Sequence, residues 1–222
     1  IDLLRALDGV DGIDRYRISS IEPNLLTDEI IAFCAASPKF QHHFHIPLQS
    51  GSDRILGLMH RRYTTARFAE RIASVRRAMP DAFIGIDVIV GFPGETEADH
   101  RTTYDFLAGL KPAFLHIFPF SERPGTPAVG MPGKVQASVV TRRVGELEEL
   151  CARLHGDFCA QASGTEADVL FESTMRGGMM FGYTGQYRRV KAPYDRSRIN
   201  TVCRVRLGAM DVSHDLWGEI RE

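Results

Sequence analysis

The feature that most restricts the fold is a repeated alternation of strand-like and helix-like segments through residues 15–120. The clearest unit is AFIGIDVIVGF at 82–92, a near-continuous apolar run typical of a parallel strand covered on its outer face. Thr96, with Asp99 three residues later, then predicts a capping box for the helix EADHRTTYDFLAGL. Further strand signals lie at 15–21, 42–48 and 113–120. This alternation predicts an α/β fold with a parallel sheet and right-handed crossovers.

Helices are predicted between these strands from residues that favour the N-cap position. Thr27 precedes IIAFCAA, Ser52 precedes DRILGLM, and Thr64 or Thr65 precedes a longer helix that Pro80 ends. In parallel α/β folds, ligands bind where the carboxyl ends of the strands meet the following loops. Those loops are EPNLL, PLQSGS, GFPGET and PFSERPGTPA, and all four carry polar groups. We therefore expect a ligand site at this end of the sheet.

The second half of the chain has a different character. VGMPGK at 129–134 is typical of a turn, and a long amphipathic helix is predicted from Val135 to about Gln161, with Gly164 suited to its C-terminal cap. Short strand-like runs separated by Gly, Pro and Asn follow, which predicts a small all-β barrel. The expected division is a parallel β/α region over 1–133, a linking helix over 134–163 and a small β-barrel over 164–222.

Composition excludes several classes of protein. The net charge is −1, so no field of the whole molecule attracts nucleic acid. No apolar run reaches the roughly 18–20 residues of a membrane helix, so we expect no membrane contact and a cytoplasmic location. None of the four cysteines forms a C-x-x-C pair, which argues against a disulfide framework and against a closed zinc or iron–sulfur site.

Three ionisable residues in the predicted strands are candidates for a metal-binding or catalytic role, but the sequence does not decide their role. His43 and His45 of HHFHIPL would share one strand face, but no third ligand is evident, and no metal site is predicted. Asp87 stands alone in an apolar strand, and a buried carboxylate needs a partner, for which Arg15 or Arg17 is available. Its role could be catalytic or structural.

Two strand-end motifs each have a functional and a structural interpretation. GFPGET allows close approach of the backbone to a ligand, but it lacks the lysine of a P-loop and serves equally as a plain strand–helix turn. Gln49, Ser50 and Ser52 in PLQSGSD offer groups suited to a ribose or a carboxylate. Ser50 or Ser52 could instead cap the next helix, and both roles remain open.

Basic residues are concentrated between 188 and 206. Seven cations face one acid, Asp195, for a local charge of +6 (7 − 1), and Tyr183, Tyr187 and Tyr194 lie nearby. A small barrel with basic and aromatic residues is typical of an RNA-binding surface. A solvated surface with buried tyrosines is the alternative. The predicted RNA contacts are Arg188, Arg189, Lys191, Arg204 and Arg206.

Together, RYRISSIEP, HFHIPLQSGSDRILGLMHRRYT, IGIDVIVGFPGET and HIFPFSERPGTPA resemble the radical S-adenosylmethionine (SAM) methylthiotransferases, in order and spacing from 15 to about 207. GYTGQYRRVKAP resembles the TRAM domain, the RNA-binding barrel that ends these enzymes. SSIEP with Glu22 is most similar to the branch that methylthiolates threonylcarbamoyladenosine beside the tRNA anticodon. Other branches act on isopentenyladenosine or on a ribosomal protein.

The resemblance implies that the chain supplies the last four strands of a six-stranded partial barrel, so the radical SAM barrel is truncated here. The family uses two [4Fe-4S] clusters, and clusters need thiolate ligands. No cysteine of this chain stands at a matching position: the four are Cys34, Cys151, Cys159 and Cys203. We therefore expect a fragment that is inactive alone, with an exposed strand edge through which a homodimer could form.

The resemblance also implies a cofactor site for SAM. Gln49 and Ser50, with Ser52, resemble the ribose-side position, and Arg61 resembles the arginine that meets the methionine carboxylate, with Arg62 as its neighbour. The strand end that frames adenine and the closing aromatic ring correspond to Ile89, Gly91, Phe92 and Phe118.

In the intact enzymes of this family, SAM is cleaved to a 5′-deoxyadenosyl radical. This radical abstracts hydrogen from the adenine ring of the target nucleoside, and sulfur and a methyl group are then attached. The partner is tRNA, with Glu22 on the substrate side; no catalytic residue is identified. The alternatives are a noncatalytic RNA-binding protein and a nucleotide-binding domain built around GFPGET.

Overall fold

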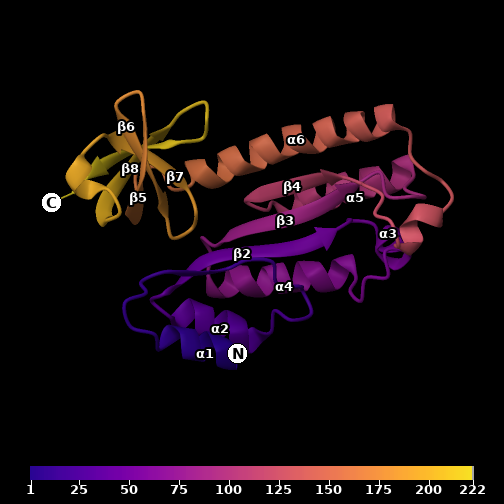
Figure 1. Cartoon of the computed structure of the whole chain (residues 1–222), viewed down its shortest axis with the longest axis horizontal. Coiled ribbons are helices and arrows are strands. Elements are labelled where there is room, and N and C mark those ends of the chain that lie inside the picture. Colours follow the sequence, from indigo (N-terminus) through magenta and orange to yellow (C-terminus); the bar gives the residue numbers. More distant parts are fainter. Residues whose placement is uncertain (222) are drawn as a thin grey trace.

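The computed structural model describes residues 1–221 and shows a layered α/β body joined by one long helix to a small β-barrel (Figure 1). The α/β body contains α1 (Asp2–Asp8), β1 (Tyr16–Ile18), α2 (Asp28–Ala36), β2 (Phe40–Gln49), α3 (Asp53–Leu58), α4 (Thr65–Ala78), β3 (Phe83–Val90), α5 (Glu97–Leu110), β4 (Phe114–Pro119) and the 3-10 helix η1 (Pro127–Gly130). The linking helix is α6 (Ala137–Ala160). The barrel contains β5 (Glu166–Arg176), β6 (Met179–Thr184), β7 (Arg189–Pro193), the 3-10 helix η2 (Arg196–Arg198), β8 (Val202–Met210) and β9 (Leu216–Ile220).

The first four strands form one parallel sheet in the order β1-β2-β3-β4. The predicted parallel α/β arrangement is therefore confirmed. The predicted helix starts are also confirmed at Thr27 and Thr64, whose side chains accept hydrogen bonds from backbone N–H groups in the first turn. Thr96 and Asp99 form the predicted capping box of α5. Local sequence signals thus set where most helices of this body begin.

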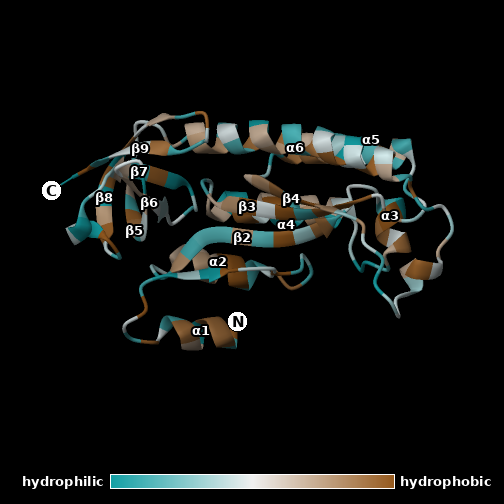
Figure 2. Cartoon of the chain, turned by 45° about the horizontal axis from the view of Figure 1, so that its top comes forward, coloured by the Kyte–Doolittle hydropathy of each residue, from teal (hydrophilic) through white to brown (hydrophobic). Residues whose placement is uncertain are grey.

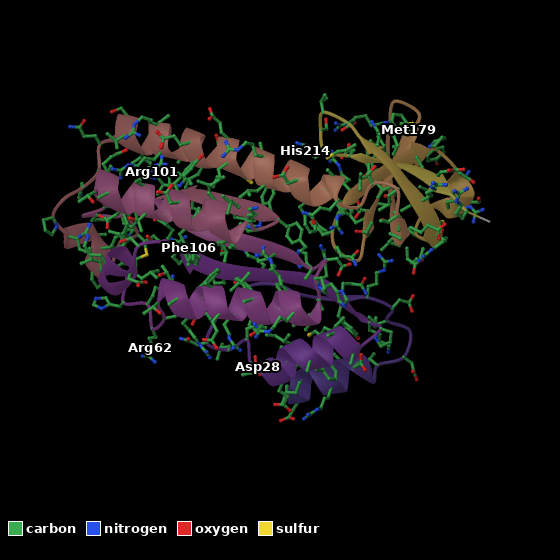
Figure 3. The ribbon with its side chains drawn as sticks, turned by 180° about the vertical axis from the view of Figure 1, so that it is seen from behind. Asp28, Arg62, Arg101, Phe106, Met179 and His214 are labelled. Atoms are coloured by element: carbon green, nitrogen blue, oxygen red, sulfur yellow. The ribbon has the colours of Figure 1, made fainter. Side chains whose placement is uncertain are left out.

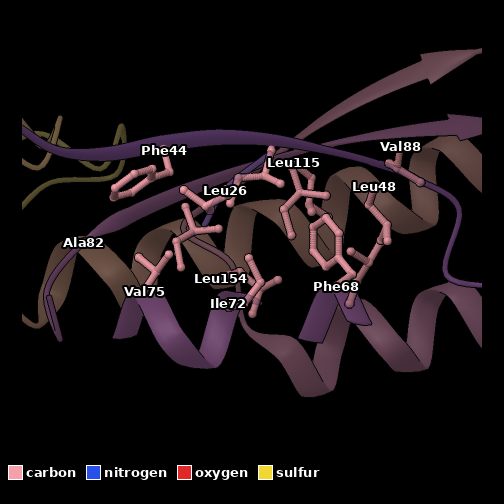
Figure 4. Close-up of a cluster of buried hydrophobic side chains, with 14 of the residues drawn as sticks. Leu26, Phe44, Leu48, Phe68, Ile72, Val75, Ala82, Val88, Leu115 and Leu154 are labelled. Carbon is pink, nitrogen blue, oxygen red and sulfur yellow. The ribbon is translucent and has the colours of Figure 1, made fainter. Parts of the chain in front are cut away.

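The period of two along the strands separates the two faces of the sheet. On β2, Phe44, Ile46 and Leu48 are fully buried against the helices, whereas His43 and His45 point to the other side. Figure 4 shows Leu48 beside Phe68, with Phe44 at the other end of the same hydrophobic cluster. The second face, which we call the open face, carries polar side chains because the helices lie on the first.

Strand β1 is shorter than the predicted 15–21 segment. Ser20 has φ +49, so the chain turns away from β2 after Ile18 and returns when the Ile21 N–H donates to the His45 carbonyl at 2.9 Å. This irregular segment leads to Glu22, on the loop that follows β1.

Helix α6 runs along β4 and ends at the small barrel (Figure 1). It carries hydrophobic and hydrophilic residues along its length (Figure 2), and Leu147, Leu150 and Leu154 are buried against the sheet body. Arg143 of α6 is 3% exposed and its guanidinium lies 2.7 Å from the Glu95 carboxylate. The same carboxylate accepts the Gly91 N–H at 2.8 Å, so the ion pair ties α6 to the loop after β3.

The last five strands close into a barrel in the order β5-β6-β7-β9-β8, which confirms the predicted small all-β barrel. Its core includes Val169, Phe171 and Val190, all fully buried. The segment GYTGQYRRVKAP is the end of β6, a turn in which Tyr187 has φ +61, and β7. No helix among residues 1–221 combines the length and the apolar character needed to cross a membrane.

Candidate functional site

The open face gathers side chains from β2, β3 and β4 that are far apart in sequence. Midway along these strands lie His45, Asp87 and His116, and nearer the carboxyl ends lie Ile89 and Phe118. Phe118 is 51% exposed, and Ile89 is half-buried beside it in the register of β3 and β4. The expected ligand end of the sheet therefore presents an apolar surface above a polar cluster.

Asp87 has a partner that the sequence did not indicate. The predicted partners, Arg15 and Arg17, were wrong: the Asp87 carboxylate lies 2.5 Å from Nε2 of His45. Arg15 instead donates to the Asp168 and Tyr183 carbonyls of the small barrel, and Arg17 lies 4.2 Å from the centre of the Tyr187 ring.

His116 completes the cluster. Its ring lies 4.5 Å from that of His45, and ligand atoms of His45, Asp87 and His116 all lie within 4.8 Å of one another. Burial and the nearby His45 lower the pKa of His116, while Asp87 acts in the opposite direction. The sequence analysis missed His116 because nothing local in AFLHIFPF shows which residue of another strand it faces.

Two of the predicted ribose-side residues do not face the open side. The Ser50 hydroxyl is fully buried and lies 3.3 Å from that of Thr103 on α5. The Ser52 hydroxyl donates to the Asp99 carboxylate at 2.7 Å. These serines join the loop after β2 to α5, so the structure favours their structural role.

Gln49 differs from the two serines. It ends β2 with φ +72, and no hydrogen bond within residues 1–221 engages its side chain. The Tyr63 hydroxyl donates to the carbonyls of Pro47 and Leu48 at 3.0 and 3.2 Å, which fixes the backbone immediately before it. Gln49 is 9% exposed, and it is the predicted residue of this loop whose side chain has no hydrogen-bond partner among the described residues.

Gly91 and Phe92 are packed rather than open. A Cβ built on Gly91 would lie 2.5 Å from a methyl carbon of Val140 on α6, and Gly91 has φ +81, which favours glycine. Phe92 is 7% exposed and meets Phe120 edge to face at 5.2 Å. GFPGET therefore contributes close packing of α6, which the sequence could not separate from backbone contact with a ligand.

The predicted carboxylate-binding arginine and the predicted substrate-side acid lie together. Arg61 approaches Glu22 to 3.4 Å, and both side chains remain partly exposed. Arg62 is exposed, and its carbonyl accepts a hydrogen bond from Asn24. Arg61 thus lies near the carboxyl ends of the strands and is paired with Glu22. Because Glu22 is solvent-accessible, the carboxylate of a ligand could replace it as the partner of Arg61.

The predicted RNA-contact residues of the barrel differ in exposure and in pairing. Arg188 is 5% exposed, lies over the Phe158 ring at 3.9 Å and donates to the Phe158 carbonyl, so it does not present its charge to the surface. Arg189 pairs with Asp215 and Lys191 with Asp211. Counting charges along the sequence could not reveal these acids, which come from the turn before β9.

The remaining two cations lie on the outer side of β8. Arg204 pairs with Glu166 and Asp168 at 3.2 and 3.3 Å. Arg206 is exposed, and its side chain has no hydrogen bond or ion pair within the described part of the chain. Arg206 is therefore the most available of the five predicted RNA contacts.

A cavity of about 690 Å³ lies between the amino-terminal ends of the strands and the barrel. Tyr183 and Tyr187 stack there at 4.6 Å, and the ring of His214 lies 5.3 Å from that of His155 on α6. His214 is labelled in Figure 3 on the barrel side of this contact. Burial and the nearby Arg17 lower the pKa of His43 in this cavity to about 4. Two of the tyrosines noted in the sequence therefore belong to the contact between the two bodies.

The four cysteines do not form a cluster site. All are buried, on α2, α6 and β8, and burial raises the pKa of Cys34 and of Cys159 to about 11. Thiolate ligation requires the deprotonated sulfur, which this environment disfavours. Residues 1–221 therefore do not fit a [4Fe-4S] cluster.

Comparison with known proteins gives related sequences. The radical SAM superfamily profile matches residues 1–107. The chain is 39% identical over 210 residues to the threonylcarbamoyladenosine tRNA methylthiotransferase MtaB of Bacillus subtilis, covering 92% of this chain and 47% of that protein. It is 48% identical over 168 residues to a tRNA-2-methylthio-N(6)-dimethylallyladenosine synthase of Mycolicibacterium smegmatis, covering 76% of this chain and 33% of that protein. The chain thus spans less than half the length of these relatives.

Among solved structures, the radical SAM enzyme coproporphyrinogen III oxidase of Escherichia coli superposes with a TM-score of 0.52 at 16% identity. The match covers 62% of this chain and 32% of that one. At this identity, the likeness concerns the fold alone, and it confirms the expected radical SAM type of sheet.

The network around Asp99 generates a prediction about stability and pH. Burial acts to raise the pKa of Asp99, but hydrogen bonds from Arg54, Thr96 and Ser52 hold it well below its usual range. We expect Asp99→Asn to lower the free energy of unfolding by about 1–3 kcal/mol at neutral pH. Because the folded-state pKa is depressed, this difference should shrink progressively as the pH falls below about 4, where the unfolded chain takes up a proton that the folded carboxylate does not yet bind.

Urea unfolding of both proteins at neutral pH and at about pH 3 measures the effect. Asp105→Asn, on the exposed side of α5 and paired with Arg101, is the matched control and should change stability by at most about 0.5 kcal/mol. An equal loss for both variants at both pH values would contradict the role of the network.

Proposed function

This chain belongs to the radical SAM methylthiotransferase family, and we propose that the whole protein adds a methylthio group to a hypermodified adenosine beside the tRNA anticodon, most specifically threonylcarbamoyladenosine. The observation that carries the proposal is the match over 92% of the chain to a relative named for that nucleoside. The wider class rests on further relatives that act on dimethylallyladenosine in tRNA. Because the chain covers 47% of the first relative, the activity is proposed for the whole protein and not for these residues alone.

The open face supports SAM as the cofactor. The partly exposed cation Arg61 suits the methionine carboxylate, because guanidinium groups bind carboxylates in a bidentate manner. Ile89 and Phe118 offer an apolar surface to the adenine ring, and the unengaged Gln49 amide suits a ribose hydroxyl. When bound, SAM supplies the radical and the methyl group, while these side chains bind and orient it and limit the access of water.

Glu22 connects cofactor and substrate in this proposal. In the structure its carboxylate is the partner of Arg61. If Arg61 were to bind the methionine carboxylate, Glu22 would lose its partner and would be able to accept hydrogen bonds from a substrate. The described residues offer no thiolate set for a cluster, so any iron–sulfur chemistry belongs to other parts of the protein.

The small barrel is proposed to hold the tRNA. Arg206, with Arg204 beside it, lies on the outer face of β8, where a phosphate could replace Glu166 and Asp168 as the partner of Arg204. Arg189 and Lys191 also remain proposed contacts. A phosphate would have to replace Asp215 as the partner of Arg189 and Asp211 as the partner of Lys191. Arg188 is left out because it is buried.

The first test uses the whole protein, reconstituted anaerobically with iron and sulfide. It is incubated with SAM and tRNA from a strain that lacks the gene, and the digested tRNA is analysed by mass spectrometry. We expect a methylthio gain on threonylcarbamoyladenosine. A gain on dimethylallyladenosine would keep the reaction and reject the proposed nucleoside. No gain with intact clusters would reject tRNA as the substrate.

Arg61→Ala should weaken binding of radiolabelled SAM to the reconstituted protein by at least about tenfold, because a charge-assisted pair with the carboxylate is lost. Equilibrium dialysis measures this affinity. Arg67→Ala removes an exposed arginine that pairs with Glu70 on α4 and should leave the affinity unchanged. Equal affinity of wild type and Arg61→Ala would show that the carboxylate binds elsewhere.

Arg206→Ala should weaken tRNA binding and reduce the slope of log K against log salt by about 0.7–0.9, as expected for one lost phosphate contact. Filter binding at several salt concentrations gives both quantities. Arg101→Ala, on α5 away from the barrel (Figure 3), should change neither. An unchanged slope for Arg206→Ala would place the RNA on another surface.

A further inference from the structure

We propose that His45, Asp87 and His116 form a binding site for one divalent transition-metal ion on the open face of the sheet. Their ligand atoms, two imidazole nitrogens and one carboxylate oxygen, lie within 4.8 Å of one another. It is the one group of three or more His, Cys, Asp and Glu residues in residues 1–221 that meets this condition. The inference concerns a second ligand of the open face and does not depend on the proposed reaction.

The three side chains are held by adjacent strands of the parallel sheet. They come from the adjacent strands β2, β3 and β4, and in the sheet register Asp87 is directly opposite His116. His45 is opposite Gly85, two residues before Asp87 on β3. Backbone hydrogen bonds of the sheet thus fix the spacing of the three ligands, in contrast to a site built on loops.

The backbone leaves room between the two histidines. A Cβ built on Gly85 would lie 3.5 Å from Nε2 of His116 and 3.1 Å from a ring carbon of Phe83. Gly85 is also the register partner of both His45 and Phe114. Gly85, the register partner of His45, therefore carries no side chain next to the His116 ring.

The donor set defines the class of ion. Two imidazoles and one carboxylate suit Zn²⁺, Fe²⁺ or Co²⁺, whereas Ca²⁺ and Mg²⁺ prefer oxygen ligands alone. Three protein ligands leave at least one coordination position for water or for an oxygen or nitrogen atom of a bound molecule. His45 and His116 line the cavity of about 690 Å³ that faces the small barrel, so the open position would face that cavity.

A hydrogen bond between His45 and Asp87 alone is the competing explanation of the cluster. The chain contains a natural comparison, because His42 and Asp81 form a similar pair at 3.3 Å with no third ligand within reach. If only the hydrogen bond matters, the cluster should bind no metal ion, and any weak binding elsewhere should not change when His116 is removed. If the three residues act together, removal of His116 or Asp87 should abolish one specific site.

The test is a titration of the purified, metal-free chain with Co²⁺, followed by its visible absorption bands, and displacement with Zn²⁺ to obtain affinities. We expect one equivalent to bind. His116→Ala and Asp87→Asn should each raise the dissociation constant by at least about 100-fold. Asp87→Asn preserves the side-chain shape, and thermal unfolding checks that each variant folds.

His42→Ala is the matched control and should leave the dissociation constant unchanged. The proposal is overturned if the wild type binds no Co²⁺ at millimolar concentration, or if His116→Ala and Asp87→Asn bind as the wild type does. Near-ultraviolet charge-transfer bands from a cobalt–thiolate bond would also overturn it, since they would assign the metal to a cysteine. These readouts need no iron–sulfur cluster and no tRNA, so they are independent of the methylthiotransferase assay.

Discussion

The alternation of side chains along β2, β3 and β4 is the constraint on which the rest of the molecule depends. Because one set of residues, such as Phe44 and Ile46, is buried against the helices, the intervening set must face the other way. A one-residue slip of β2 would bring His45 into the hydrophobic core and remove the polar cluster from the open face. The burial of core side chains therefore also fixes the register of Asp87 and His116, which no local motif specifies.

The ends of the strands are held by polar contacts that sequence patterns suggest as ligand-binding. Ser52 and Asp99 join the loop after β2 to α5, and Arg143 and Glu95 join the loop after β3 to α6. Such a buried ion pair costs desolvation, so its value is to fix one arrangement of the loops more than to add net stability. Burial accordingly raises the pKa of Glu95 despite the adjacent arginine. Of the predicted cofactor residues near these loops, Gln49 has no side-chain hydrogen bond among the described residues, and Arg61 has only the solvent-accessible partner Glu22.

The small barrel shows why a local charge count is a weak guide to an RNA-binding surface. The segment 188–206 carries a formal +6, but Asp211 and Asp215 from a later turn pair with Lys191 and Arg189. Arg188 serves the contact with α6 through the Phe158 ring. The positive charge available to bind RNA is therefore smaller than the sequence indicates. The main proposed RNA-binding surface is the outer side of β8.

The sequence alone determined the elements and their class. Apolar runs with a period of two, capping residues such as Thr96 and the change of pattern after α6 specify a parallel α/β sheet and a closed β-barrel, because these signals act over a few neighbouring residues. Motif order also gave the family. Only the tertiary structure decided which side chains meet: that Asp87 pairs with His45 and not with Arg15 or Arg17, that Ser50 is buried, and that His116 joins the cluster. Those outcomes depend on strand register and long-range packing, in which residues tens of positions apart become neighbours, and no local pattern encodes them.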